Sequence, residues 1–207
     1  MLEELISPEI TSENPTQNLK LTNVYDVAGR LVTRINESNR ITHYKYDDVG
    51  RLIETIYPDE TPNNESNNPR TKVEYYKNGN LKAEIDERGN RTEYRYSTEG
   101  ELIEIIYAYD TPNTLLDNPR TTYKYDAAGR RISETNPRNH TTTFVYDKLN
   151  RLKETQFHDQ TQTTIGYDAL GRRISSTDPN GKVTRYEYDA AGRLTDVVQN
   201  LNRQESD

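Results

Sequence analysis

Three histidines are the residues of this chain best suited to acid–base chemistry or metal binding. His43, His140 and His158 stand at three different distances from a tyrosine that recurs along the sequence, so no two of them occupy equivalent places. We therefore interpret them as exposed strand or turn residues. The chain has no cysteine, which excludes thiolate metal ligands and disulfide bonds. We expect neither a metal site nor a cofactor.

An aspartate directly follows the recurring tyrosine in six places, and a glycine stands three residues after it. A carboxylate in this place can accept hydrogen bonds from its own turn, while glycine or asparagine adopts a positive φ most easily. A row of metal ligands is the alternative, but a fixed place within a turn favours a structural cap. The predicted turn residues are Asp26, Gly29, Asp47, Gly50, Gly79, Gly100, Asp126, Gly129, Asp147, Asn150, Asp168, Gly171, Asp189 and Gly192.

Motifs of catalysis are absent from the sequence. It contains no G-x-S-x-G, H-E-x-x-H, Walker or calcium-loop pattern. We therefore predict no catalytic residue and no enzyme activity. Lys and Arg total 27 against 34 acidic residues, which argues against binding to a nucleic-acid backbone. No apolar run is long enough to predict a membrane span, and no signal peptide is visible.

The elements that carry these residues repeat with a fixed period. The tyrosine recurs at spacings of 21 or 29 residues, and each 29 is a 21 with eight residues added. Both additions, 59–71 and 109–121, contain Asn-Pro-Arg-Thr at places 50 residues apart, which indicates duplication of a two-repeat block. The recurring tyrosines are Tyr25, Tyr46, Tyr75, Tyr96, Tyr125, Tyr146, Tyr167 and Tyr188.

The residues before each tyrosine alternate in the manner of a β-strand. A threonine stands four residues before each of the seven tyrosines after Tyr25, and usually an aromatic residue stands two before, so these side chains share one face. A second strand and a second turn complete one β-hairpin per repeat. We expect the shared face to form ladders across the sheet, from Thr42, Tyr44, Tyr46, Thr92, Tyr94, Tyr96, Thr121, Tyr123, Tyr125, Thr142, Phe144, Tyr146, Thr184, Tyr186 and Tyr188.

The predicted fold is therefore all-β: tandem hairpins in an extended, curved antiparallel sheet. Only 31% of the residues are hydrophobic, so ladders of modest cross-strand contacts must offset a thin core. Residues 157–162 lack the turn consensus and are expected to be the irregular place. Aromatic faces also suit sugars, so Tyr44, Tyr94, Tyr123 and Tyr186 are candidate glycan contacts. Packing between repeats is the favoured role for them.

The combination of Y-D-x-x-G-R-L with T-x-Y-x-Y-D resembles the YD repeats of the RHS family, from about residue 21 to residue 200. That family includes bacterial Rhs polymorphic toxins, the B and C components of insecticidal Tc toxins, wall-associated proteins and teneurins. The resemblance implies a ribbon that spirals into a hollow shell around a toxic polypeptide. In other members it implies carbohydrate binding and surface adhesion. The carboxylate pair that releases the toxin in bacterial shells has no counterpart here.

The resulting hypothesis is a structural, non-enzymatic part of an RHS shell that encapsulates or presents a toxin or effector. A carbohydrate-binding or cell-surface adhesion module is the alternative. We expect a polar, disordered segment over 1–20, eight repeats over 21–200 and a polar tail over 201–207. The last repeat supplies one strand after Tyr188, and its open edge predicts pairing with further RHS-repeat polypeptide or self-association. The resemblance implies a secreted or surface location in bacteria.

Overall fold

The computed structural model describes residues 2–6, 20–59, 67–108 and 118–200. These residues form antiparallel β-strands joined by turns, and no helix occurs among them. The strands are β1 (Leu2–Ile6), β2 (Lys20–Tyr25), β3 (Leu31–Ile35), β4 (Ile41–Tyr46), β5 (Leu52–Ile56), β6 (Arg70–Tyr75), β7 (Leu81–Ile85), β8 (Arg91–Tyr96), β9 (Leu102–Ile106), β10 (Arg120–Tyr125), β11 (Arg131–Thr135), β12 (Thr141–Tyr146), β13 (Leu152–Gln156), β14 (Gln162–Tyr167), β15 (Arg173–Thr177), β16 (Val183–Tyr188) and β17 (Leu194–Asn200).

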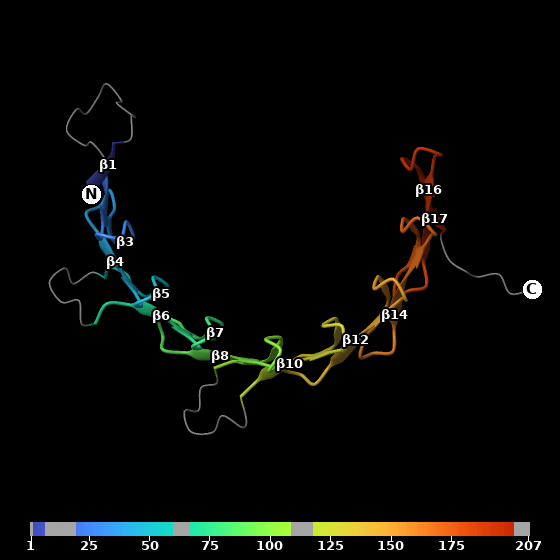
Figure 1. Cartoon of the computed structure of the whole chain (residues 1–207), viewed down its shortest axis with the longest axis horizontal. Helices are drawn as coiled ribbons and strands as arrows, with labels where there is room; N and C mark the ends of the chain where they lie inside the picture. Colours follow the sequence, from blue (N-terminus) through green and yellow to red (C-terminus); the bar gives the residue numbers. More distant parts are fainter. Residues whose placement is uncertain (1, 7–19, 60–66, 109–117, 201–207) are drawn as a thin grey trace, which may run out of the picture. The chain divides into compact units, whose positions relative to one another are not determined.

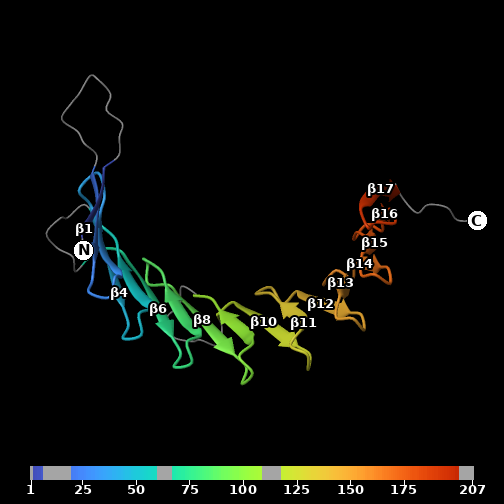
Figure 2. The ribbon, with the colours of Figure 1, turned by 45° about the horizontal axis from the view of Figure 1, so that its top comes forward.

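The chain divides into two compact units, residues 1–94 with 107–118 and residues 95–106 with 119–207. In the first unit each strand from β1 to β7 pairs with the next one along the chain. In the second unit the strands from β9 to β17 pair in the same consecutive way. Figures 1 and 2 show the strands following one another in chain order within each unit. The predicted all-β fold of tandem hairpins is confirmed, while the curvature of the whole ribbon stays a prediction.

In repeats without the eight added residues, both turns have the same backbone geometry. In the first turn the N–H of Asp26 donates to the carbonyl of Arg30, and the N–H of Gly29 donates to the carbonyl of Asp26. The second turn repeats this pattern between Asn36 and Arg40. The fourth residue of each turn has a positive φ, as at Gly29 (80°). Such a φ is open to glycine and tolerable for asparagine.

Seven of the first turns are flanked by a β-bulge, where the repeat tyrosine before the turn pairs with the strand after it. Between β4 and β5, Lys45 pairs with Glu54 but Tyr46 pairs with Leu52, so Ile53 is an extra residue on β5. The same shift occurs at the repeat tyrosine of β2, β6, β10, β12, β14 and β16. Bulges bend a strand and increase its local twist, so each repeat carries its own source of twist.

The turn at 157–161 is regular, so the expectation of an irregular place there is wrong. Phe157 N–H donates to the Thr161 carbonyl, and Gln160 takes the left-handed place with a φ of 67°. The Asp159 carboxylate accepts hydrogen bonds from the backbone N–H and the hydroxyl of Thr161. The backbone geometry is therefore kept although the consensus residues are missing.

Residues 2–6 form a strand, which differs from the disordered segment expected over 1–20. Ile6 pairs with Lys20 as Ile56 pairs with Arg70, so β1 takes the place that the second strand of a preceding repeat would hold. Its sequence agrees, because Leu2, Glu4 and Ile6 recur 50 residues later as Leu-x-Glu-x-Ile in β5. Residues 7–19 of the expected segment and the tail at 201–207 lie outside the described residues.

Few side chains are fully buried in the described part of the chain. The buried hydrophobic residues there are Ile56, Ala83 and Ile106, and Thr55 and Thr121 are buried polar residues. A single-layer sheet cannot enclose a thick core, so most stabilisation has to come from contacts between neighbouring strands.

Candidate functional site

The aspartate of each first turn is the acceptor that holds the turn closed. Asp47 Oδ1 accepts hydrogen bonds from the backbone N–H groups of Val49 (3.1 Å) and Arg51 (2.9 Å). Asp47 Oδ2 accepts a third from Arg51 Nε at 2.7 Å. The carboxylate therefore fixes the backbone of the turn and the direction of the arginine side chain at once.

The same hydrogen bonds affect the ionisation of these carboxyls. At Asp147, the hydrogen bond from the Arg151 side chain and then that from its backbone N–H lower the pKa below the ordinary value of 3.8. The bonded form is therefore the charged one at neutral pH. A charged carboxylate with all these donors is a structural cap, and its oxygens are already engaged.

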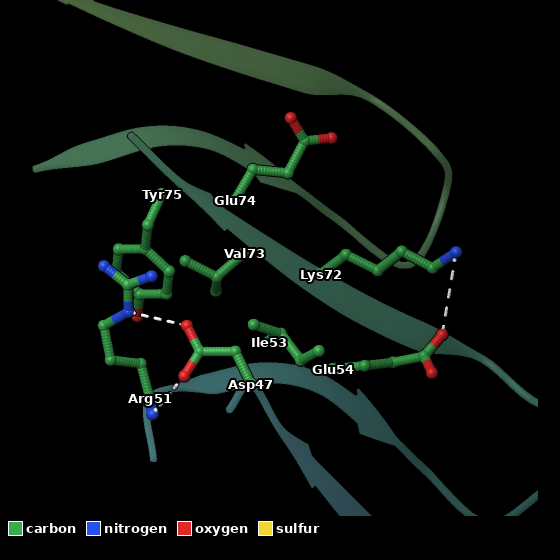
Figure 3. Close-up of a pocket in the computed structure, with 8 residues that line it drawn as sticks. All are labelled: Asp47, Arg51, Ile53, Glu54, Lys72, Val73, Glu74 and Tyr75. Atoms are coloured by element: carbon green, nitrogen blue, oxygen red, sulfur yellow. Dashed lines mark hydrogen bonds and ion pairs between the residues drawn. The ribbon is translucent and has the colours of Figure 1, made fainter. Parts of the chain in front are cut away.

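In five of the first turns the arginine then reaches into the next repeat. The Arg51 guanidinium lies over the Tyr75 ring, 4.3 Å from its centroid (Figure 3). The Tyr75 hydroxyl donates a hydrogen bond to the Leu52 carbonyl at 3.3 Å. Asp47, Arg51 and Tyr75 thus join the first turn of one repeat to the first strand of the next. We call this arrangement an Asp–Arg–Tyr triplet.

Complete triplets recur in both units. The arginine lies between 4.3 and 5.0 Å from the ring centroid in each of them. The described triplets are Asp26–Arg30–Tyr46, Asp47–Arg51–Tyr75, Asp126–Arg130–Tyr146, Asp147–Arg151–Tyr167 and Asp168–Arg172–Tyr188. A cation over an aromatic face contributes about 0.5–1 kcal/mol at exposed sites and more when desolvated. Repetition makes this small contribution a property of the whole ribbon.

Two repeats lack the Asp and the Arg but keep the turn by other means. In one, Ser97 Oγ accepts the N–H groups of Glu99 and Glu101, each at 3.2 Å, and so replaces the carboxylate. In the other, Asn78 Oδ1 accepts the N–H of Asn80 at 3.1 Å, and the Tyr76 N–H donates to the Asn80 carbonyl at 2.8 Å. Gly79 and Gly100 hold the left-handed places in these two turns. The turn geometry is therefore shared by all repeats, whereas the triplet is not.

The predicted ladder threonines lie opposite the same position of the preceding strand from one repeat to the next. Thr71 lies opposite Thr55 of the preceding strand, and Thr163 lies opposite Thr155. Thr121 is 4% exposed. The predicted ladder residues occupy the same places in β4, β8, β10, β12 and β16, namely Thr42, Tyr44, Tyr46, Thr92, Tyr94, Tyr96, Thr121, Tyr123, Tyr125, Thr142, Phe144, Tyr146, Thr184, Tyr186 and Tyr188.

Arginine side chains lie over several of the aromatic residues two places before the repeat tyrosine. Arg131 lies 5.6 Å from the ring centroid of Tyr123 and 5.0 Å from that of Phe144. Arg173 lies 4.9 Å from that of Tyr186. Two of the four candidate glycan-stacking rings, Tyr123 and Tyr186, therefore have a guanidinium of the chain itself over one face.

The strand residues between the ladder positions form networks of ion pairs, which were not predicted from the sequence. Glu74 accepts two hydrogen bonds from the Arg91 guanidinium, at 2.7 and 2.9 Å, and Arg91 Nε donates to Glu93 at 2.8 Å. Ala83 stands between Glu74 and Glu93 in the register and is fully buried. The hydrogen bond from Arg91, helped by Lys82, lowers the pKa of Glu74 from 4.5 to about 2.

A groove follows one triplet in the first unit. It has a volume of about 490 Å³ and is lined by the triplet together with Ile53, Val73, Glu54, Lys72 and Glu74. Figure 3 shows the Asp47–Arg51 pair at one end and the Glu54–Lys72 ion pair at the other. The carboxylates that line it are paired with basic side chains, as at Asp47 and Glu54. Within the described ranges no cluster of His, Asp and Glu could hold a metal ion.

Two of the three histidines come together on neighbouring second turns. The rings of His140 and His158 stack with centroids 3.6 Å apart and planes 6° from parallel. His140 is the fifth residue of its turn and His158 is the second residue of its own. Because the two histidines stand at different positions of the repeat, the sequence pattern did not predict this contact. His43 belongs to the first unit, where its Nδ1 lies 3.2 Å from the Thr33 hydroxyl.

Similar proteins agree with this geometry. The RHS Repeat family model matches residues 25–62, 75–112, 125–164 and 167–202, which is more than half of the chain. A crystal structure of TcdB2-TccC3 superposes with a TM-score of 0.67 and 16% sequence identity, covering 88% of this chain and 11% of that one. A structure of a Photorhabdus luminescens Tc holotoxin pore gives a TM-score of 0.65 and 16% identity, covering 89% and 10%.

This chain therefore spans about a tenth of the length of those structures, and at such identity the likeness shows the fold. No curated protein matches the chain significantly. In the part that the structure describes, no helix has the length and hydrophobicity needed to cross a membrane. The hairpin repeats, their Y-D-x-x-G-R turns and the family match lead to one conclusion: the chain belongs to the RHS repeat family and is a structural module of it.

Proposed function

We propose that this chain is one length of the wall of a hollow RHS shell that encloses or presents a toxin or effector polypeptide. The single observation that carries the proposal is the Asp–Arg–Tyr triplet, which joins five pairs of successive repeats by the same contacts. A wall built in this way grows by adding repeats and needs no thick core. Likeness to the TcdB2-TccC3 structures supports the same role.

This proposed role implies two partners and a cellular location. A wall segment needs further RHS-repeat polypeptide at its sheet edges, either another chain or a second copy. The enclosed polypeptide is the second partner. Because the wall serves a polypeptide delivered outside the producing cell, we place the chain at the bacterial surface or in the medium.

Sugar binding is the competing role for the aromatic residues, and the geometry gives it less support. The Arg131 and Arg173 guanidinium groups lie over Tyr123 and Tyr186, where a sugar ring would stack. The Tyr94 hydroxyl donates to Glu84 Oε2 at 2.6 Å, so its polar end is also engaged. These rings serve packing between strands, and the wall does not require a glycan.

Protease protection tests the wall directly. The chain is expressed together with the polypeptides encoded on either side of its reading frame, and the purified assembly is treated with a protease. We expect a neighbouring polypeptide to co-purify and to resist digestion, with a cavity visible by electron microscopy. The same assembly carrying Arg151→Ala should protect less well, while Arg138→Ala, on an exposed second turn, should protect fully. A bare ribbon with nothing bound and no cavity would contradict the proposal.

A further inference from the structure

The stacked rings of His140 and His158 join the second turns of two neighbouring repeats in the second unit. The ring centroids lie 3.6 Å apart and the ring planes are 6° from parallel. β12 pairs with β13 as far as Thr143 opposite Gln156, and past that pair each strand continues into its own turn. The stack therefore lies beyond the last pair of the register and holds the two turns side by side.

Each of the two histidines belongs to a closed turn. The His140 N–H donates to Asn136 Oδ1 at 3.1 Å, and the His140 carbonyl accepts the Asn136 N–H at 3.0 Å. His158 is the second residue of a turn that is closed by the Phe157 N–H, which donates to the Thr161 carbonyl at 2.8 Å. Because both backbones are fixed in this way, the distance between the rings depends on how close the two turns lie.

The next pair of neighbouring second turns has other residues at these two places. Thr161 stands where His140 stands in the earlier turn, and Pro179 stands at the place of His158. Neither side chain can stack as an aromatic ring or gain a charge on acidification. The turn at 178–182 nevertheless closes through the same two backbone hydrogen bonds. It is therefore a comparison turn within the same unit, with the same backbone and without the histidine contact.

The surroundings of the stack can balance one positive charge. The hydrogen bonds from the Thr161 hydroxyl and backbone N–H, followed by positive charge on His158, hold the pKa of the Asp159 carboxyl below its ordinary value. Asp159 is thus a counter-ion for one charged ring, whereas Arg138 adds positive charge to the turn of His140. The charged groups of the two turns, of the strands around them and of the comparison turn are Arg120, Arg131, Glu134, Arg138, Lys153, Glu154, Asp159, Asp178 and Lys182.

We propose that the His140–His158 stack is an acid-sensitive clasp, which holds the two second turns together at neutral pH and releases them when both rings are charged. Histidine is the side chain that ordinarily changes its charge between pH 5 and 8. Two like charges at the separation of these rings repel each other. Separated turns can take up both protons, so the open form gains population as the pH falls. The clasp goes beyond the proposed wall, because it regulates one joint between repeats whatever the wall encloses.

Hydrogen exchange of the full chain measures this opening directly. Exchange of the segments 136–145 and 152–161 is followed by mass spectrometry at pH 7.5 and pH 5.0, and each rate is divided by the rate of an unstructured chain at the same pH. We expect the corrected exchange of both segments to rise at least about tenfold at pH 5.0, because one like-charge contact at this distance has an effect of that order. Segment 178–188, which contains the comparison turn, should keep its corrected rate. Unchanged exchange of the two histidine segments would overturn the clasp.

Phenylalanine variants separate the charge of the rings from their stacking. His158→Phe keeps a ring that can stack and cannot be charged, so the rise at pH 5.0 should disappear while exchange at pH 7.5 stays near that of the parent chain. His140→Phe should give the same result from the other side of the contact. His43→Phe, in the first unit, is the matched control and should keep the rise. A rise of the parent's size in both stack variants would overturn the proposal. The isolated chain is used, so this failure would leave the protease-protection result standing.

Discussion

Arg151 and Tyr167 belong to successive repeats, yet the guanidinium of Arg151 lies 4.4 Å from the centroid of the Tyr167 ring. The arginine is held there by Asp147 of its own turn, at 2.7 Å. The tyrosine is held by the hydrogen bond from its hydroxyl to the Leu152 carbonyl, at 3.0 Å. Each partner is thus held by its own hydrogen bond, and the repeat that contains Tyr167 receives a cation from the repeat before it.

The tyrosine hydroxyl should contribute to stability apart from its ring. Tyr167→Phe keeps the ring under Arg151 and removes only the hydrogen bond to Leu152. We expect the free energy of unfolding to fall by about 0.5–1.5 kcal/mol, measured by urea denaturation. Tyr186→Phe is the matched control, because the Tyr186 hydroxyl makes only a marginal 3.5 Å contact with Ser176. Equal losses for the two variants would argue against a specific role of the repeat tyrosine.

The left-handed place in the first turn should reject β-branched residues. Gly129 has a φ of 74°, and a Cβ added there would lie 3.4 Å from Glu101 Oε1. Gly129→Val should cost about 1–3 kcal/mol and unfold its repeat first, as seen by hydrogen exchange. Gly129→Asn should cost clearly less, because Asn150 holds the equivalent place with a φ of 64°. Unchanged melting of the valine variant would show that the turn tolerates another conformation.

Acid should weaken the ion pairs around Glu74. The folded-state pKa of Glu74 is lowered from 4.5 to about 2 by Arg91 and Lys82. Its contribution to stability is therefore complete above pH 4.5, where the carboxyl is charged in both states. It is lost as the pH falls from 4.5 towards 2, because the unfolded chain takes up the proton first.

Two variants separate this carboxyl from the others. In Glu74→Gln, the loss of unfolding free energy between pH 4.5 and 2 should be smaller than in the parent chain. Glu37→Gln, on an exposed second turn, should keep the parent profile. Identical pH profiles for the parent chain and Glu74→Gln would contradict the role of Glu74.

Local sequence was enough to predict the hairpins and their turns. The alternation of Thr42, Tyr44 and Tyr46 defines one face of a strand, and an Asp followed by Gly three residues later defines a turn. Both signals lie within a few residues of each other. Because most repeats contain both signals at the same places, the repetition predicted the fold class.

The contacts between repeats needed the register of the sheet, which the sequence did not reveal. Arg51 and Tyr75 are 24 residues apart, and the register in which β5 pairs with β6 brings them together. Glu74 and Arg91 meet across β7 for the same reason. One sequence signal for the triplet was available. The fifth residue of the first turn is usually arginine, whereas the fifth residue of the second turn varies from repeat to repeat.

Two other misses have different physical causes. The strand at Leu2–Ile6 has no turn consensus near it, and only its identity with β5 at every second residue marks it. The turn at Gln160 lacks glycine and asparagine, yet neighbouring hairpins on both sides hold its backbone in the common geometry. Tertiary pairing here overrides a poor local sequence.

The most direct test of the account is a double-mutant cycle between Arg151 and Tyr167. Unfolding free energies are measured for Arg151→Ala, Tyr167→Leu, the double variant and the parent chain, and the same cycle is run for Arg151 with Tyr188, which belongs to the next triplet. We predict a coupling energy of about 0.5–1 kcal/mol for Arg151 with Tyr167 and none for Arg151 with Tyr188. Strict additivity for Arg151 and Tyr167 would contradict the claim that the triplet joins one repeat to the next.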